Sequence, residues 1–269
     1  MDNYNPNDNF NNYQNNYNNG YNSDYGTNYS GSDYMNSGLE SGNPVVKTFS
    51  DVKAILVEEV VAKSFLFMVV ALLITAYASL TTSPRVAIRM LTGYNFCILL
   101  VAELLIVMVS NWAVKKNNAI LAGVLFAVYS YLTGVTFSIL FMAFTTTSIT
   151  TIFLLTAALF GIMAVYGLVT KKDLTSIGSI CFMGLIGIIL ATVINMFFLR
   201  NSMFDTIISA VGVLVFVGLT AYDTQKIKKM VAYSNDGNVL TLALMGAFEL
   251  YLDFINLFLK LLRLFGKRR

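Results

Sequence analysis

The chain has 269 residues, of which 56% are hydrophobic and only 12% charged, and its formal net charge is +3. A soluble domain typically has about 45–50% apolar and about 25% charged residues. A globule of this length could not bury so many apolar side chains, so the composition excludes an ordinary soluble protein and predicts a surface that largely faces lipid. The small net charge also excludes a strongly basic surface for nucleic acid.

The sequence contains no histidine. This excludes Ser-His-Asp and Cys-His catalysis and histidine-ligated zinc sites. It also removes the side chain that most often senses pH near neutrality. Any proton-linked behaviour must then come from carboxylates or lysines in unusual surroundings.

Residues 1–45 differ in composition from the rest of the chain. They are rich in Asn, Tyr, Gly and Ser and have almost no aliphatic side chains, so they have little to bury against the entropy of ordering. We expect a disordered tail that is either passive or weakly self-associating, because polar and aromatic residues alternate in it. With no basic residue before Lys47 and no apolar core, the segment does not have the features of a signal peptide.

Residues 46–269 are predicted to form a membrane domain. The segment 47–63 has apolar residues near helical spacing, which predicts an interfacial helix leading into the first span. Seven apolar stretches follow, each close to the roughly 20 residues that a helix needs to cross the hydrocarbon core. They run over residues 62–82, 94–114, 119–143, 150–170, 175–198, 204–226 and 240–265.

Basic residues are distributed unevenly between the two sides of the predicted bundle. The side opposite the tail has only Arg85, Arg89 and Arg200 before the C-terminus, so the positive-inside rule predicts a cytoplasmic tail. Seven crossings would place the basic C-terminal end GKRR on the opposite side, in conflict with that rule. One alternative is a re-entrant last span. In the other, which we expect, there are seven full spans and the basic C-terminal end lies on the side opposite the tail despite the rule. The basic residues on the side of the tail are Lys47, Lys53, Lys63, Lys115, Lys116, Lys171, Lys172, Lys226, Lys228 and Lys229.

Four acidic residues fall inside predicted spans. An acid at the centre of a membrane helix costs roughly 2.5–3.5 kcal/mol on insertion scales, so each is a candidate functional residue. Glu103 lies in the second span and Asp223 in the sixth, whereas Glu249 and Asp253 both lie in the seventh.

The polar residues of the seventh span lie on one face of a helix. Glu249, Asp253, Asn256, Lys260 and Arg263 are separated by steps of four, three, four and three residues, and apolar residues fill the positions between them. Such a helix belongs inside a bundle, where its polar stripe faces other polar groups. In the alternative interpretation, the acids and bases of the stripe neutralise one another along the helix.

The sixth and seventh spans could bring two carboxylates together. Asp223 lies near the cytoplasmic end of the sixth span, and an antiparallel seventh span would place Asp253 at a similar depth. Two carboxylates in contact at low dielectric constant should hold one proton between them, and its loss would introduce repulsion between the helices. This arrangement would be a pH switch without histidine. In the alternative, Asp223 extends into the headgroup region.

Several motifs resemble the transmembrane Bax inhibitor motif family. They are LYLDFINLFLKLLRLFG in the seventh span, AYDTQKI in the sixth and TKKDLTSIG before the fifth, and GVTFSILF in the third span and Glu103 also fit. The similarity covers about residues 50–269. It implies an all-α integral membrane protein with six helices around a central, C-terminal seventh, here a bacterial-type member in a plasma membrane. Members are associated with a pH-sensitive calcium leak, and eukaryotic ones with suppression of cell death.

The resemblance also implies roles for individual residues. Asp223 and Asp253 match the paired aspartates that act as pH sensor and gate, and Glu103 matches an acid of the second span in the ion path. Carboxylate and amide oxygens suit Ca²⁺, so the aspartate pair is a candidate Ca²⁺ contact. Three further residues are candidates for the ion path. These are Glu249, which could instead pair with Lys260; Asn256; and Asn195, which could instead cap or bridge helices.

The loop after the second span departs from the pattern of close bacterial relatives. They carry an arginine run after the tryptophan that ends this span, and an arginine there latches the closed state. Here Trp112 is followed by Ala113, Val114, Lys115 and Lys116. A lysine can pair with a carboxylate but lacks the bidentate fork of arginine, so Lys115 and Lys116 are candidates for a weaker latch.

The function predicted from the sequence is a pH-sensitive calcium leak with no resident cofactor, whose partners are the bilayer, calcium ions and protons. The alternative is a non-transporting regulator that binds membrane proteases or other cell-death and stress partners. An intramembrane aspartyl protease would also place a Tyr-Asp in one helix and an aspartate in the next. Here the second motif reads YLDF, and the bulky Leu252 and Phe254 would keep a substrate backbone away, so we expect no enzyme.

Overall fold

The computed structural model describes residues 49–90, 92–233 and 238–269. The tail predicted at residues 1–45 lies outside the described residues. The described part is built from helices, which in chain order are α3 (Phe49–Thr81), α4 (Pro84–Met90), α5 (Tyr94–Lys115), α6 (Ala119–Phe137), α7 (Leu140–Ala143), α8 (Thr146–Val169), α9 (Thr175–Ile194), the π-helix η1 (Asn195–Leu199), α10 (Ser202–Tyr233) and α11 (Val239–Phe265).

Six helical stretches in the described part are long and apolar enough to cross a membrane. The remaining predicted span, residues 94–114, coincides with α5, in which the apolar stretch is the shorter Val101–Val114. The described part of the chain is therefore helical, the chain is a multi-span membrane protein, and its seventh crossing stays a prediction. The six stretches are Ala54–Thr81, Ala119–Ala143, Thr146–Val169, Thr175–Leu199, Ser202–Val231 and Val239–Phe265.

Two helices are longer than the sequence predicted. The interfacial helix expected at residues 47–63 is not separate from the first span, because α3 runs unbroken and contains neither proline nor glycine. Lys63 pairs with Glu59 one turn earlier, at 2.6 Å. The sixth span was expected to end at residue 226, but α10 continues to Tyr233 and so keeps Lys226 and its neighbours helical.

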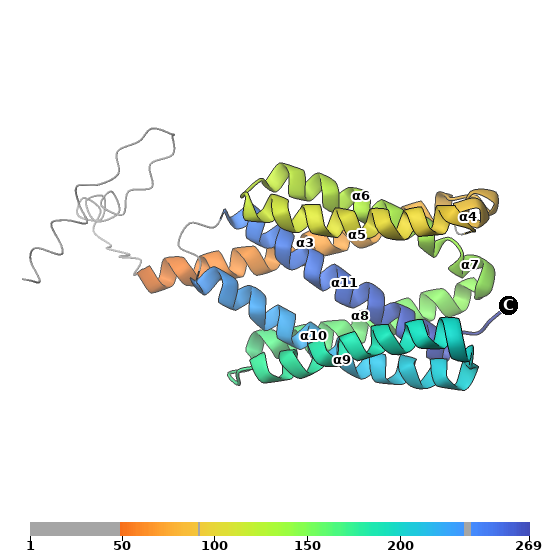
Figure 1. Ribbon diagram of the computed structural model, residues 1–269. Helices are drawn as coiled ribbons and strands as arrows, with labels where there is room; N and C mark the ends of the chain where they lie inside the picture. Colours follow the sequence, from red (N-terminus) through yellow and green to blue (C-terminus); the bar gives the residue numbers. More distant parts are fainter. Residues whose placement is uncertain (1–48, 91, 234–237) are drawn as a thin grey trace, which may run out of the picture. The chain divides into compact units, whose positions relative to one another are not determined.

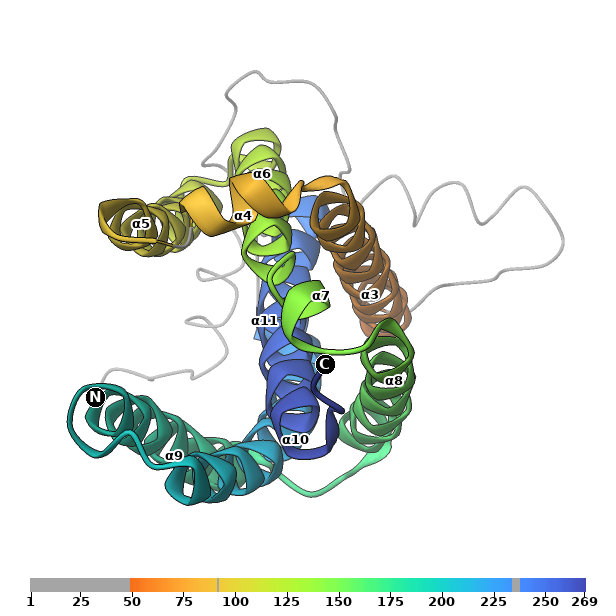
Figure 2. The same ribbon diagram turned by 90° about the vertical axis from the view of Figure 1, so that its right-hand side faces the viewer.

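Helix α11 is the most buried of the candidate spans. In its most apolar stretch 61% of the residues are buried, against 33% or less in the other five. It contacts α3, α5, α6, α8 and α10, whereas α9 packs against α10. Figures 1 and 2 show α11 running through the middle of the bundle, with α5 and α6 on one side and α9 and α10 on the other. The polar stripe of α11 is therefore surrounded by other helices.

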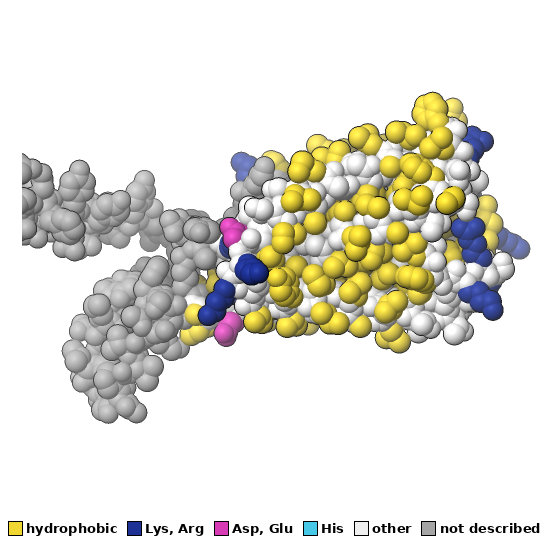
Figure 3. Space-filling model, turned by 90° about the horizontal axis from the view of Figure 1, so that it is seen from below, with side chains coloured by type: hydrophobic (Ala, Val, Ile, Leu, Met, Phe, Trp, Pro, Cys, Tyr) yellow, Lys and Arg dark blue, Asp and Glu magenta, His cyan; other side chains and the backbone are white. Residues whose placement is uncertain are grey.

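The outer surface is apolar along the middle of the bundle. Leu66 and Leu214, near the middle of α3 and α10, are among the exposed large apolar side chains. In Figure 3 apolar side chains cover the middle of the visible face, and the charged side chains gather at its two ends. This distribution is expected when the middle contacts hydrocarbon and the ends contact water.

The C-terminal residues fix the far end of α11. The backbone N–H of Thr145 donates to the carbonyl of Lys267, and that of Arg269 donates to the carbonyl of Ala143, both at 3.1 Å. Phe144 and Arg268 form an isolated antiparallel bridge between these two bonds. Because α11 is one continuous helix of 27 residues, the structure does not support a re-entrant last span.

Candidate functional site

A cavity of about 620 Å³ lies between α9, α10 and α11. Its α9 wall is mainly apolar, whereas α10 and α11 contribute charged and amide side chains. Four of the residues predicted as functional are thereby brought together, and a lysine that was not predicted joins them. These polar lining residues are Asp223, Glu249, Asp253, Asn256 and Lys226.

The two predicted aspartates are in contact across α10 and α11. The carboxyl groups of Asp223 and Asp253 lie within hydrogen-bonding reach of each other. Asp253 is only 5% exposed, and its Oδ2 finds no hydrogen-bond partner among the described residues. Because a carboxylate can only accept, a hydrogen bond between the two groups requires that one of them carries a proton. The structure thus places the partly buried Asp223 beside Asp253 in the lining of the cavity.

Glu249 forms an ion pair with a residue that the sequence did not single out. Lys226 Nζ of α10 lies 2.6 Å from Glu249 Oε1, and both side chains are partly exposed. The expected alternative, a pairing of Glu249 with Lys260 along α11, is therefore wrong. Lys226 follows Asp223 by three residues, so helical spacing already puts both on one face of α10. That spacing was the signal from which Lys226 could have been found.

The rest of the polar stripe of α11 also faces α10. The amide of Asn256 donates to the carbonyl of Leu252 at 2.8 Å, and the side chain lines the cavity. One turn further on, the alkyl chain of Lys260 packs over Gly212 of α10. Arg263 then pairs with Asp205 of α10 at 2.6 Å. The charges of Glu249 and Arg263 are thus compensated by residues of α10, not by residues along α11.

The motifs AYDTQKI of α10 and TKKDLTSIG before and within α9 contact each other in the structure. Gln225 of α10 accepts from the backbone N–H of Leu174 at 2.9 Å and donates to the carbonyl of Lys172 at 2.8 Å. A Cβ added at Gly178 would lie 2.5 Å from the ring of Tyr222, so glycine allows α9 to approach α10 closely. These contacts fix the part of α10 that carries Asp223.

An ion pair at the surface also joins α10 to the loop that precedes α9. Lys229 Nζ lies 2.5 Å from Asp173 Oδ1, in the loop between α8 and α9. The hydrogen bond from Lys229, together with those from the side chain and backbone of Thr175, holds the pKa of the Asp173 carboxyl well below its usual range. Asp173 is therefore ionised at neutral pH.

Glu103 lies away from the acidic cavity, beside α6. Thr136 of α6 donates to its carboxylate at 3.3 Å. The carboxylate of Glu103 also lies near the hydroxyl groups of Tyr129 and Tyr251. Glu103 is not among the described residues that line the acidic cavity. The structure therefore does not bring Glu103 together with Asp223 and Asp253.

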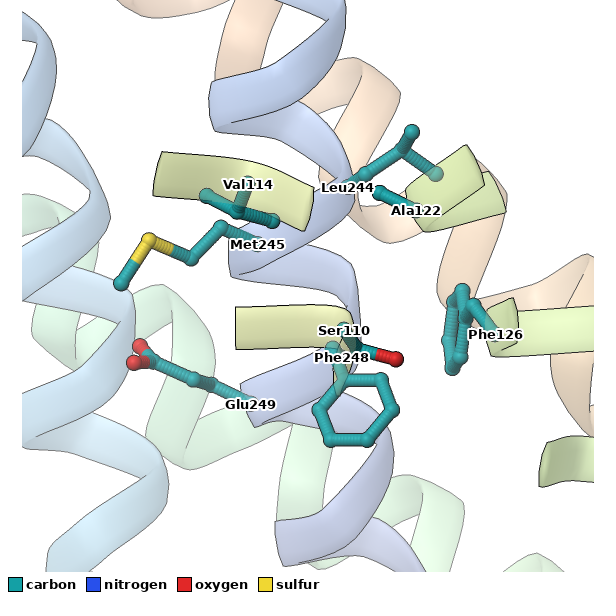
Figure 4. A pocket seen from close by; sticks show the side chains of 8 residues that line it. All are labelled: Ser110, Val114, Ala122, Phe126, Leu244, Met245, Phe248 and Glu249. Atoms are coloured by element: carbon teal, nitrogen blue, oxygen red, sulfur yellow. The ribbon is translucent and has the colours of Figure 1, made fainter. Parts of the chain in front are cut away.

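A second, much smaller cavity of about 20 Å³ lies between α5, α6 and α11. Figure 4 shows Ser110, Phe126 and Phe248 around it, with the carboxylate of Glu249 pointing away from the two aromatic rings. A volume of this size holds about one water molecule. The small cavity is thus bounded by α5 and α6 and the large acidic one by α9 and α10, and Glu249 of α11 lines both.

Three other predicted site residues lie outside the acidic cavity. Asn195, at the end of α9, accepts from the backbone N–H of Asn201 at 3.0 Å and donates to its carbonyl at 3.2 Å. It therefore bridges the connection to α10, which was its expected alternative role. Lys116 is exposed at the C-terminal end of α5 and belongs to none of the ion pairs found among the described residues. The side chain of Lys115 lies outside the described residues.

The cavity does not have the geometry of a preformed metal site. Within residues 49–90, 92–233 and 238–269, no three acidic or cysteine side chains are grouped closely enough to hold a metal ion.

The fold and the site together define a class of protein: a multi-span helical membrane protein with carboxyl groups inside its bundle. Comparison with known proteins narrows this class. The family model described as "Inhibitor of apoptosis-promoting Bax1" matches residues 57–269. The chain therefore belongs to the Bax inhibitor family, as the motifs of the last three spans predicted.

Bacterial proteins from distant groups are similar to this chain. The inner membrane protein YbhL of Escherichia coli strain K12 is 43% identical over 214 residues, which cover 77% of this chain and 91% of that protein. The protein RP147 of Rickettsia prowazekii is 42% identical over 77% of this chain and 89% of its own length. A protein of Borreliella burgdorferi is 43% identical, with coverages of 77% and 91%.

Proposed function

We propose that this chain is a pH-sensitive leak for Ca²⁺, gated by the contact between Asp223 and Asp253. The observation that carries the proposal is the position of these two carboxyl groups. They lie within hydrogen-bonding reach of each other, on the two most C-terminal helices, in the wall of a cavity of about 620 Å³. Such a contact joins α10 to α11 when one proton is shared and drives them apart when that proton is lost.

The size of this repulsion is adequate for gating. Two unit charges about 4 Å apart repel by about 4 kcal/mol at an effective dielectric constant of about 20. Conformational equilibria of proteins are commonly balanced within a few kcal/mol, so a change of this size reverses a population. The central position of α11 means that a shift of this helix relative to α10 would alter packing through much of the bundle.

The proposed path runs along the polar wall of the cavity. Asp223, Asp253 and the amide of Asn256 present oxygen atoms, and Lys226 offsets part of the charge of Glu249. Calcium would be a passing ion here, in keeping with a wall that has no preformed metal cage among the described residues. Glu103 lies beside α6, so we place it outside this path.

The proposed setting is a bacterial plasma membrane with the N-terminus in the cytoplasm. The similar protein of Escherichia coli is named an inner membrane protein. In this arrangement α5 provides the seventh crossing, because it is 22 residues long and its neighbour in the sequence, α6, packs against it. Lysines at the ends of α8 and α10 would then face the cytoplasm.

The direct test is calcium entry into proteoliposomes of the purified protein at pH 6 and pH 8. Wild type should give a flux above that of empty liposomes, with a rate that differs between the two pH values. In Asp223→Asn the difference should disappear, because an amide cannot lose the shared proton. A pH dependence that persists in both Asp223→Asn and Asp253→Asn would contradict the switch. No flux at either pH would favour the non-transporting regulator, for which partner capture with and without residues 1–45 is the next test.

A further inference from the structure

The acidic cavity is larger than a passing calcium ion requires. Its volume of about 620 Å³ falls in the range of roughly 300–1,000 Å³ that is typical of sites for small organic molecules. Such sites combine mainly apolar walls with a few polar groups that fix the orientation of the ligand. The cavity therefore has the size of a binding site for a small organic molecule.

Its walls are divided into an apolar part and an acidic part. Phe182 and Met183 of α9, with Leu219 of α10, form much of the apolar part. Phe182 and Met183 are 58% and 62% exposed, so the cavity opens on the apolar outer surface of the bundle. A molecule dissolved in the bilayer could enter beside these two side chains.

The acidic part contains oxygen atoms without partners. Asp253 is 95% buried, because its exposure is 5%, and its Oδ2 has no hydrogen-bond partner among the described residues. Oε2 of Glu249 is also buried and without a partner there, although Oε1 pairs with Lys226. A buried carboxylate oxygen without a donor is costly, so both atoms favour a ligand that donates hydrogen bonds.

The charge of the lining indicates the charge of the ligand. Asp223, Glu249 and Asp253 contribute three carboxyl groups, and Lys226 is the basic residue among the side chains that line the cavity. Lys226 neutralises Glu249. If Asp223 and Asp253 share one proton, the pair keeps one negative charge, so the cavity lining keeps a net negative charge. The occupant that complements this wall is a cation with N–H donors and an apolar body.

We propose that the cavity binds an amphipathic organic amine. Its ammonium group lies between Asp253 and Asp223, where it takes the place of the shared proton and donates to Oδ2 of Asp253. Its apolar body lies against Phe182 and Met183 of α9. This inference uses the same cavity as the proposed calcium leak, but it does not depend on ion flux, so either proposal can fail without the other.

The test uses a photoreactive probe and a matched neutral control. A diazirine-bearing alkylamine and the corresponding alkyl alcohol are each irradiated with the full-length protein in phosphatidylcholine nanodiscs, and the labelled peptides are mapped by mass spectrometry. The amine should label the segments that line the cavity, saturably and in competition with excess octylamine. The alcohol should give no saturable labelling there. Equal labelling by both probes would overturn the proposal.

Variants locate the ammonium group. Asp253→Asn should weaken saturable amine labelling by about tenfold or more, since a charge-assisted hydrogen bond is lost. Asp223→Asn should act in the same direction and serves as the second variant if Asp253→Asn does not fold. Glu103→Gln is the matched control, because it changes an intramembrane acid outside the cavity, and labelling should be unchanged. Unchanged labelling in both aspartate variants would contradict the proposal.

A further arm distinguishes two sources of the amine. Phosphatidylethanolamine presents an ammonium group on a lipid, so the labelling is repeated in nanodiscs that contain it. Lower amine labelling would identify the lipid headgroup as an occupant of the cavity. Unchanged labelling, with competition by octylamine retained, would identify a free amine as the ligand.

Discussion

Two polar regions lie on different sides of α11, and they are built in opposite ways. On the side of α3 and α6, the hydroxyl of Tyr251 lies 2.7 Å from Oγ1 of Thr75, which also donates to the carbonyl of Ser130. Tyr251 is fully buried, and its ring packs edge-on against Phe126 and Tyr129. On the side of α9 and α10, the groups are carboxyls and a lysine around a cavity of about 620 Å³.

This difference separates the side of α11 that fixes the helix in place from the side that can respond to pH. Hydroxyls are neutral at every physiological pH, and the hydrogen bonds of Tyr251 and Thr75 are made without a titrating proton, although the carboxyl group of Glu103 lies near Tyr251. In the proposed function, the contact between Asp223 and Asp253 requires that one of the two carboxyl groups is protonated. We therefore expect substitutions near Tyr251 to change stability, and those near Asp253 to change pH dependence.

Among the three changes compared below, the largest effect on stability should come from the close contact of α3 with α6. A Cβ added at Gly134 would lie 2.5 Å from the backbone carbonyl oxygen of Thr75 and 2.6 Å from Cβ of Ala78. Because a backbone atom cannot rotate away, Gly134→Ala should lower the free energy of unfolding by about 1–3 kcal/mol or more. Thermal unfolding in detergent measures this, with Gly161→Ala, whose added Cβ meets no atom within 4 Å, as the control.

A smaller effect on stability should follow removal of the Tyr251 hydroxyl. Tyr251→Phe keeps the aromatic packing and removes one buried hydrogen bond to Thr75, which is worth about 0.5–1.5 kcal/mol. The ratio of calcium flux at pH 6 to that at pH 8 should stay at the wild-type value. A changed ratio would show that the two sides of α11 are not separate in function.

The smallest effect is expected from the surface ion pair of Asp173 with Lys229. The pKa of Asp173 is lowered in the folded protein, so the stabilisation is present above the ordinary carboxyl pKa and is lost only as pH falls through the lowered value. Asp173→Asn should therefore leave the pH dependence of flux between pH 6 and pH 8 unchanged. A lost dependence would place the sensor in the loop between α8 and α9.

Those features of the site that depend on helical spacing could be predicted from the sequence. The steps between Glu249, Asp253 and Asn256 put them on one face, and antiparallel order put Asp223 at a similar depth, so their common cavity could be anticipated. The partner of Glu249 was missed because attention to spacing within α11 favoured Lys260. The lysine that it contacts, Lys226, lies on the neighbouring helix.

The positions of Glu103 and Asn195 could not be predicted from the sequence, because they depend on how the helices are ordered around α11. Glu103 lies beside Thr136 of α6, and no periodicity within α5 indicates which side of α11 that helix will occupy. For the same reason, Asn195 could equally have faced the interior or closed a loop. Its two hydrogen bonds to Asn201 show that it does the latter.

The most direct test of the central claim asks whether the aspartate pair carries a proton. A hydrophobic carbodiimide adds to a protonated carboxyl group in an apolar site, and the adduct can be located by mass spectrometry. We expect that Asp223 or Asp253 is labelled at pH 6, that labelling falls as pH is raised, and that the ionised Asp173 is not labelled. Labelling of neither aspartate at pH 6, or equal labelling at pH 6 and pH 9, would contradict the shared proton and with it the proposed gate.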